Sequence, residues 1–74
     1  MSKEINFLDL EDYPSYYEVD LWGSGDCDSH FFQSKREAID YFNKHKSHKD
    51  DNVKHFECGY YGDYECELIK GNNK

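Results

Sequence analysis

Carboxylates are the most numerous reactive groups in this chain, and they are unevenly distributed. Asp and Glu number 16 against nine Lys and Arg, which gives a formal net charge of −7 on 74 residues. Residues 1–34 contain eight of these acids and only Lys3 among the bases, whereas residues 35–54 contain four acids and six bases. A strongly acidic section repels nucleic acid and acidic lipid and attracts basic surfaces, such as those that bind nucleic acid. The competing interpretation is an ordinary solvated surface, because acidic proteins are common.

Two cysteine–histidine pairs have the composition of a catalytic thiolate–imidazole pair but not its surroundings. They are Cys27 with His30 and Cys58 with His55. Cys27 lies among acids, which raise a thiol pKa and so oppose thiolate formation. The sequence also contains no P-loop or other glycine-rich phosphate-binding motif. We therefore do not expect an enzyme.

Metal-binding patterns are also incomplete. His45 and His48 are three residues apart, but no pair of cysteines has the close Cys-x2-Cys spacing of a structural zinc site. Residues 26–37 partly follow a calcium-binding loop with Glu37 at its twelfth position, yet Phe31 occupies the place of the required glycine. We predict neither a metal nor a cofactor.

Length and composition indicate one small α+β domain over residues 1–74, with residues 1–14 as an arm or extra strand and 71–74 as a frayed tail. Aromatic residues make up 18% of the chain, enough for a compact core but not for a large enclosed pocket. No segment resembles a signal peptide or a membrane span. We expect a cytosolic protein whose three cysteines are mostly reduced.

One helix and four strands should form the domain. Ser34 and Glu37 form a capping box, and Ala38, Ile39 and Phe42 follow at helical spacing, which predicts a helix that ends near Lys46. Residues 16–22 alternate as a half-buried strand, a glycine turn follows at 23–26, and a short strand contains Phe31 and Phe32. Residues 53–60 and 64–69 should form a hairpin. The predicted order is β-β-α-β-β, an antiparallel sheet with the helix packed on one face.

The register of the second hairpin follows from its apolar residues. A two-residue turn at Gly62-Asp63 would mix apolar and charged side chains on one face, whereas a three-residue loop at 61–63 pairs Phe56 with Leu68 and Cys58 with Cys66. This register sets Glu57 opposite Glu67 on the outer face. The predicted inner layer consists of Tyr17, Val19, Leu21, Phe31 or Phe32, Ala38, Ile39, Phe42, Phe56, Cys58, Tyr60, Cys66 and Leu68.

The outward acids are the candidate binding residues. Residues two apart on a strand lie about 6.6–7 Å from one another, which is roughly the spacing of successive backbone phosphates in a duplex. Tyr13, Tyr16, Trp22 and Tyr61 fall outside the predicted core, either as interface anchors or as a second small core under the N-terminal arm. The predicted partner-binding set is Asp9, Glu11, Asp12, Tyr16, Glu18, Asp20, Trp22, Asp26, Asp28, Glu57, Glu65 and Glu67.

In length, charge and organisation the chain resembles small acidic phage proteins that mimic DNA, including the inhibitors of the histone-like protein HU made by Bacillus phages. The resemblance implies a protein without turnover that blocks the DNA-binding surface of a basic host protein (HU, RNA polymerase or a defence nuclease) in the bacterial cytosol. It implies no direct contact with nucleic acid or membrane. An immunity protein or antitoxin against a basic toxin, and an adaptor that binds through exposed aromatics, are the alternatives. A homodimer formed through a free edge strand is also compatible with the sequence.

Overall fold

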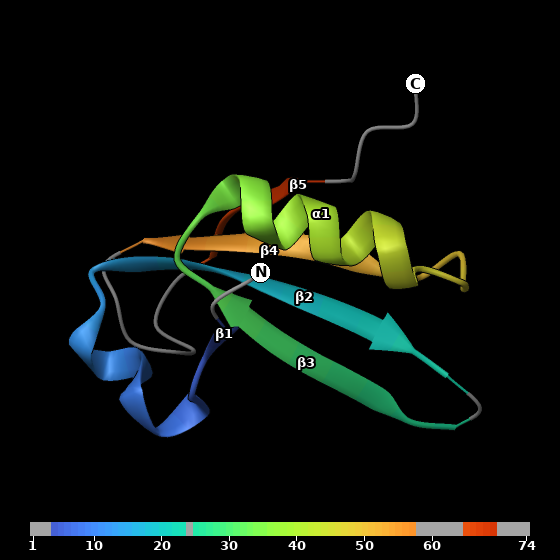
Figure 1. Cartoon of the computed structure of the whole chain (residues 1–74), viewed down its shortest axis with the longest axis horizontal. Coiled ribbons are helices and arrows are strands. Elements are labelled where there is room, and N and C mark those ends of the chain that lie inside the picture. The colour runs from blue at the N-terminus through green and yellow to red at the C-terminus, as the bar shows by residue number, and fades with distance from the viewer. Residues whose placement is uncertain (1–3, 24, 58–64, 70–74) are drawn as a thin grey trace.

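The fold is an antiparallel sheet with one α-helix, so the predicted α+β class is confirmed (Figure 1). The computed structural model describes residues 4–23, 25–57 and 65–69, the last of these as backbone only. Strands β1 (Glu4–Ile5), β2 (Ser15–Trp22), β3 (Cys27–Phe32), β4 (Asn52–Glu57) and β5 (Glu65–Ile69) lie in the order β1-β3-β2-β4-β5. The 3-10 helix η1 (Phe7–Asp12) precedes β2, and α1 (Lys35–His45) joins β3 to β4.

The helix begins and ends where the sequence predicts. The side chain of Ser34 accepts a hydrogen bond from the Glu37 backbone N–H at 3.4 Å, which satisfies one free amide of the first turn. At the other end Lys46 is the cap, and its N–H donates to the Phe42 carbonyl at 2.8 Å. Ala38 and Phe42 are buried against the sheet.

Both faces of the sheet are covered, and each holds its own apolar cluster. The helix-side cluster lies under α1 and consists of Val19, Phe32, Ala38, Phe42 and Val53, with Tyr17, Leu21, Ile39 and Tyr41 at its border. The arm-side cluster lies on the opposite face, against β1 and η1, and consists of Ile5, Leu10, Tyr16, Phe31 and Phe56, with Tyr13 packed against it. Figure 1 shows α1 and η1 on opposite sides of the strands.

The second cluster corrects two predictions about the core. Phe56 was expected on the helix side, but its ring stacks on Tyr16 of the arm side with 5.2 Å between ring centroids. Tyr16 was expected as an exposed anchor, but it is 0% exposed. Of the two interpretations of the extra aromatics, the structure supports the second core for Tyr16 and Tyr13, because β1 and η1 cover that half of the face.

The register of β4 and β5 also differs from the prediction. Lys54 pairs with Leu68 and His55 with Glu67, and an irregularity then sets Phe56 opposite Glu65. The predicted pairs of Phe56 with Leu68 and Glu57 with Glu67 are therefore wrong. The prediction assumed one apolar face, whereas β4 supplies Val53 to one cluster and Phe56 to the other. Cys58, Tyr60 and Tyr61 lie outside the described residues, as do the side chains of Cys66 and Leu68.

A buried carboxylate connects the loop after α1 to the end of β2. Asp51 is 2% exposed, and its side chain accepts hydrogen bonds from the backbone N–H groups of Trp22 (2.7 Å), Ser47 (2.7 Å) and His48 (3.0 Å). Burial alone would raise the pKa of Asp51, but these three hydrogen bonds together lower it below the usual value. The loop after the helix is thus fixed to the central strand by an ionised side chain.

Candidate protein-binding surface

The two central acids of the predicted site are buried. Glu18 and Asp20 are 6% and 4% exposed. They lie on the arm-side face of β2, where Ser29 of β3 donates from its Oγ to Asp20 Oδ1 at 3.0 Å. Lys54 of β4 places its Nζ 3.3 Å from Asp20 Oδ2. The prediction that Glu18 and Asp20 face a partner is wrong, since side chains of both neighbouring strands enclose them.

Their ionisation also differs from that of a phosphate backbone. Burial raises the pKa of Glu18 to about 8, and a hydrogen bond with Asp20 and the charge of Asp20 act in the same direction, while Lys54 opposes them. At neutral pH the pair therefore carries mainly one negative charge, which Lys54 balances. Ionisation of Glu18 therefore destabilises the fold as pH rises, and this buried group presents little net charge outward.

Three predicted acids are exposed on η1. Asn6 caps this 3-10 helix by accepting a hydrogen bond from the Leu8 N–H at 2.9 Å, and Leu10 anchors it in the arm-side cluster. Because Leu10 is the residue of η1 that points into the cluster, the other residues of this helix face solvent. Asp9, Glu11 and Asp12 are exposed, as are Phe7 and Leu8. We call Asp9, Glu11 and Asp12 the η1 acids.

Two more acids and an aromatic residue lie at the tip of the β2–β3 hairpin. Gly23 N–H donates to the Asp26 carbonyl at 2.7 Å, and Gly25 has a φ of +87°, which favours glycine at that position. Asp26 and Asp28 are exposed, and we call them the hairpin acids. Trp22, opposite Cys27 in the ladder, is 43% exposed, so its predicted exposure is confirmed.

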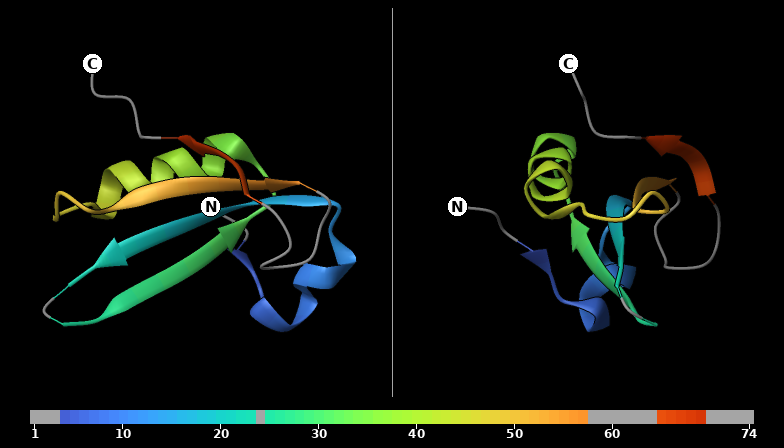
Figure 2. Two further views of the ribbon diagram at one scale, coloured as in Figure 1. Left: turned by 180° about the vertical axis from the view of Figure 1, so that it is seen from behind. Right: turned by 90° about the vertical axis from the view of Figure 1, so that its right-hand side faces the viewer.

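The η1 acids and the hairpin acids lie on different parts of the fold. Asp28 is opposite Leu21 in the ladder, so its side chain lies on the face of the sheet that carries α1. In Figures 1 and 2, η1 and the hairpin tip extend from opposite ends of the sheet. Within the described ranges the ion pairs involve other acids, and none involves the η1 acids or the hairpin acids. Exposed bases instead lie on α1 and its C-terminal end, at Lys35, Arg36, Lys44 and Lys46. These exposed bases thus belong to different elements from the η1 acids and the hairpin acids.

The other predicted acids lie on β4 and β5. Glu57 is exposed at the end of β4, and its carboxylate lies 4.0 Å from His55 Nε2. Glu65 and Glu67 belong to β5, where only the backbone is described. Glu67 is opposite His55 in the ladder. These three residues belong to neither the η1 acids nor the hairpin acids.

The structure separates the one cysteine–histidine pair that it describes. Cys27 and His30 are three residues apart on β3, so their side chains lie on opposite faces of the sheet. Partial burial and the charge of Asp20 raise the pKa of the Cys27 thiol, which keeps it protonated. Both observations oppose thiolate chemistry at Cys27.

His30 instead links three elements in a contact that the sequence did not suggest. Its Nδ1 lies 2.9 Å from Glu4 Oε2 of β1, and its Nε2 lies 3.3 Å from the Tyr41 hydroxyl of α1. Burial, Glu4 and Asp28 raise the pKa of Tyr41, so the phenol stays protonated. Sequence periodicity does not predict these contacts, because Glu4 and Tyr41 are 26 and 11 residues away from His30 in the sequence.

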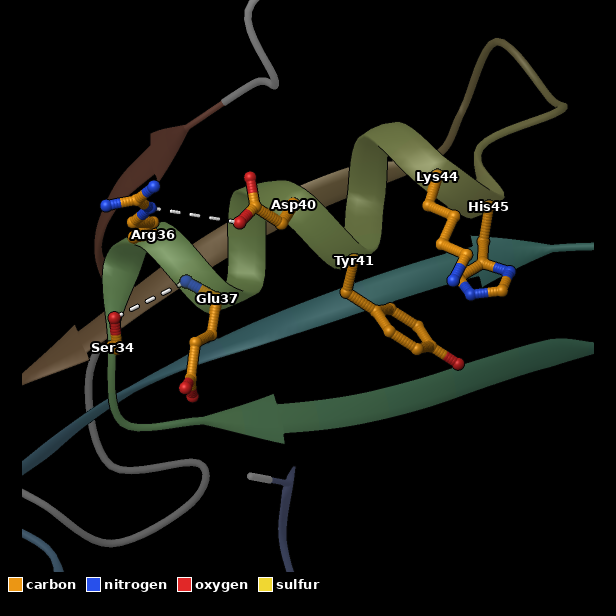
Figure 3. A pocket seen from close by; sticks show the side chains of 7 residues that line it. All are labelled: Ser34, Arg36, Glu37, Asp40, Tyr41, Lys44 and His45. Atoms are coloured by element: carbon orange, nitrogen blue, oxygen red, sulfur yellow. Dashed lines mark hydrogen bonds and ion pairs between the residues drawn. The ribbon is translucent and has the colours of Figure 1, made fainter. Parts of the chain in front are cut away.

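A shallow hollow runs along α1 beside this contact (Figure 3). Three of its side chains extend toward β3, those of Tyr41, Lys44 and His45. On the upper side of the helix, Arg36 Nε lies 4.0 Å from Asp40 Oδ2. The lining side chains carry both charges and do not converge on one point. This hollow therefore has no arrangement typical of a catalytic centre.

Three further observations bear on function. Among residues 4–23, 25–57 and 65–69 there is no group of three or more His, Cys, Asp or Glu placed to hold a metal ion. Within those same residues, no helix has the length and apolar character needed to cross a membrane. Comparison with protein-family models, with curated proteins and with solved structures found no match.

Proposed function

We propose that the protein is a non-catalytic inhibitor that occupies the DNA-binding surface of a basic protein, as the phage DNA mimics do. The observation that carries this proposal is the set of five exposed carboxylates, on η1 and at the hairpin tip, that form no ion pair among the described residues. Unneutralised surface charge of one sign steers an oppositely charged partner toward it. The contact residues are Asp9, Glu11, Asp12, Asp26, Asp28 and Trp22.

The proposed contact set is smaller than the one predicted from the sequence. Glu18, Asp20 and Tyr16 are excluded because they are buried, and Glu57, Glu65 and Glu67 are not needed for the argument. Mimicry then depends on two separated groups of charge on η1 and the hairpin rather than on one charged strand. Trp22 supplies the aromatic anchor that a charged surface needs for a lasting complex.

The partner is a nucleic-acid-binding protein such as HU, RNA polymerase or a defence nuclease. The first test captures proteins from a bacterial lysate on the immobilised chain at low and at high salt and identifies them by mass spectrometry. We expect a nucleic-acid-binding protein that is released by salt and displaced by duplex DNA, because both compete with the carboxylates. Capture that resists both salt and DNA would contradict the proposal.

Matched variants then test the surface with the captured protein. Neutralising the hairpin acids (Asp26→Asn with Asp28→Asn) or the η1 acids (Asp9→Asn, Glu11→Gln and Asp12→Asn) should slow association severalfold and reduce its salt dependence. Asp40→Asn is the control, since Asp40 is exposed but belongs to α1 and lies 4.0 Å from Arg36. Equal rates for all variants would show that the η1 acids and the hairpin acids are not the contact.

A further inference from the structure

Half of β3 forms an open border of the sheet. On its inner side β3 pairs with β2 along its whole length, from Cys27 to Phe32. On its outer side β1 pairs with Phe31 and Phe32 only, because the chain leaves the sheet at Asn6 and enters η1. Cys27, Asp28 and Ser29 are exposed and His30 is partly so, and no described strand pairs with their outer side. Figure 1 shows this part of β3 between β1 and the hairpin tip.

The register identifies which backbone groups face outward at this border. Gly23 N–H donates to the Asp26 carbonyl, so these opposite residues form a hydrogen-bonded pair. Such pairs alternate along an antiparallel ladder, so Asp28 and His30 also point their backbone groups toward β2. The N–H and C=O groups of Cys27 and Ser29 therefore point away from β2 and are free to pair with another strand. These are four backbone hydrogen-bonding groups in a row.

The side chains around this border indicate the chemistry of a partner strand. Asp26 and Asp28 are exposed at its hairpin end, and Glu4 is exposed at its β1 end. On the arm-side face a hollow adjoins the border, with walls that include Phe7 and Phe31 and a rim that includes Glu4 and Ser29. The side chains of Asp28 and of Glu4, whose carboxylate pairs with His30, lie on the opposite, helix-side face. A partner strand that alternates basic and apolar residues therefore fits both faces, with its basic side chains beside Asp26 and Asp28 and its apolar ones against the aromatic rings.

We propose that the outer side of Cys27–His30 binds an extended basic peptide segment of another protein by strand addition. Main-chain hydrogen bonds to Cys27 and Ser29 supply the pairing, and Asp26 and Asp28 select lysine or arginine side chains. A second copy of this chain is the poorer occupant, because antiparallel pairing of two such borders brings their acids together. The inference does not depend on whether the partner also binds nucleic acid.

Hydrogen exchange measured by NMR tests the proposal residue by residue. The probe is a short blocked peptide that alternates lysine and valine, with the glutamate–valine peptide as its control. We expect saturating lysine peptide to slow exchange of the Cys27 and Ser29 amides at least about tenfold, because it satisfies them. The Asp28 and His30 amides are internal controls, since they already bond to β2. Protection elsewhere in the chain, or none, would overturn the proposal.

Two variants separate pairing from charge. Cys27→Pro removes one outward N–H at a place where an edge strand tolerates proline, and it should abolish protection of Ser29 by the peptide. Asp28→Lys keeps the backbone and should weaken binding about two- to fivefold. Asp40→Lys on α1 is the charge-matched control and should change affinity little. Unchanged binding by Cys27→Pro would refute strand addition.

Self-association is tested with the same observable. If the Cys27 and Ser29 amides are already protected in the absence of peptide, and the protection decreases on dilution, a second copy occupies the border and the proposal is wrong. If both amides exchange freely at all concentrations, the border is open as proposed. Undiminished DNA-displaceable capture by the η1 variants bears on the proposed function alone, because the η1 acids take no part in strand addition, so the two proposals can fail separately.

Discussion

Asp51 is expected to stabilise the fold far more than its exposed neighbour Asp50. Its carboxylate accepts three backbone hydrogen bonds while 2% exposed. A hydrogen bond to a charged group contributes about 1.5–3 kcal/mol, but water can replace Asp51 at the Ser47 and His48 amides, which lie on exposed residues. We therefore expect Asp51→Ala to lower the free energy of unfolding by about 2–4 kcal/mol.

That loss is large for a chain of this length. A domain of 74 residues is expected to have a free energy of unfolding of about 4–11 kcal/mol. Asp51→Asn should cost nearly as much as alanine, since an amide places an NH2 group against at least one N–H donor. Asp50→Ala should cost less than about 1 kcal/mol, because the Asp50 side chain is 63% exposed and lies 3.7 Å from His48.

The assay is urea denaturation of the three variants at several pH values. The pKa of Asp51 is lowered on folding, so its contribution is complete above the ordinary value of 3.8 and is lost as pH falls through the folded value. The difference between wild type and Asp51→Asn should therefore shrink below about pH 4. Equal stability of the Asp51 and Asp50 variants at neutral pH would refute the reasoning.

Two further predictions concern the buried residues of β2. Glu18→Gln should match wild type near pH 5 and be more stable by about 1–3 kcal/mol at pH 9, because the raised pKa of Glu18 makes its ionisation unfavourable as pH rises from 4.5 through about 8. Thermal unfolding across this pH range measures the difference, and parallel pH profiles would contradict it. Tyr16→Ala should lower the free energy of unfolding by about 3–5 kcal/mol and Trp22→Ala by about 1 kcal/mol or less, since they are 0% and 43% exposed. A reversed order in urea denaturation would mean that the arm-side cluster is not a core.

Local signals were sufficient to predict α1 and the β2–β3 hairpin, but not the 3-10 helix η1. The Ser34 cap and the spacing of Ala38 and Phe42 predicted α1, and the glycines at 23 and 25 predicted the turn between β2 and β3. These signals come from residues that are close to one another in the sequence. They are therefore the same whichever elements pack against the faces of the sheet.

The faces of the strands were predicted less well because both faces are covered. Alternation in β2 separates Tyr17, Val19 and Leu21 from Tyr16, Glu18 and Asp20, but it does not show whether the second set meets solvent or an arm. The burial of Tyr16 depends on Leu10 of η1 and on Phe56 of β4, and that of Asp20 on Lys54. Exposure of the hairpin acids followed from the predicted glycine turn, whereas the η1 acids were expected on an arm and lie on a 3-10 helix.

The two clusters on opposite faces have a consequence for how the chain folds during synthesis. The β2–β3 hairpin and α1 arise from consecutive residues, but β4 supplies Val53 to one cluster and Phe56 to the other. Neither cluster can close until β4 docks beside β2, and its docking completes both at once. A nascent chain still lacking β4 therefore exposes two unfinished apolar faces on the ribosome, where the acids of its first 34 residues help to keep it from aggregating.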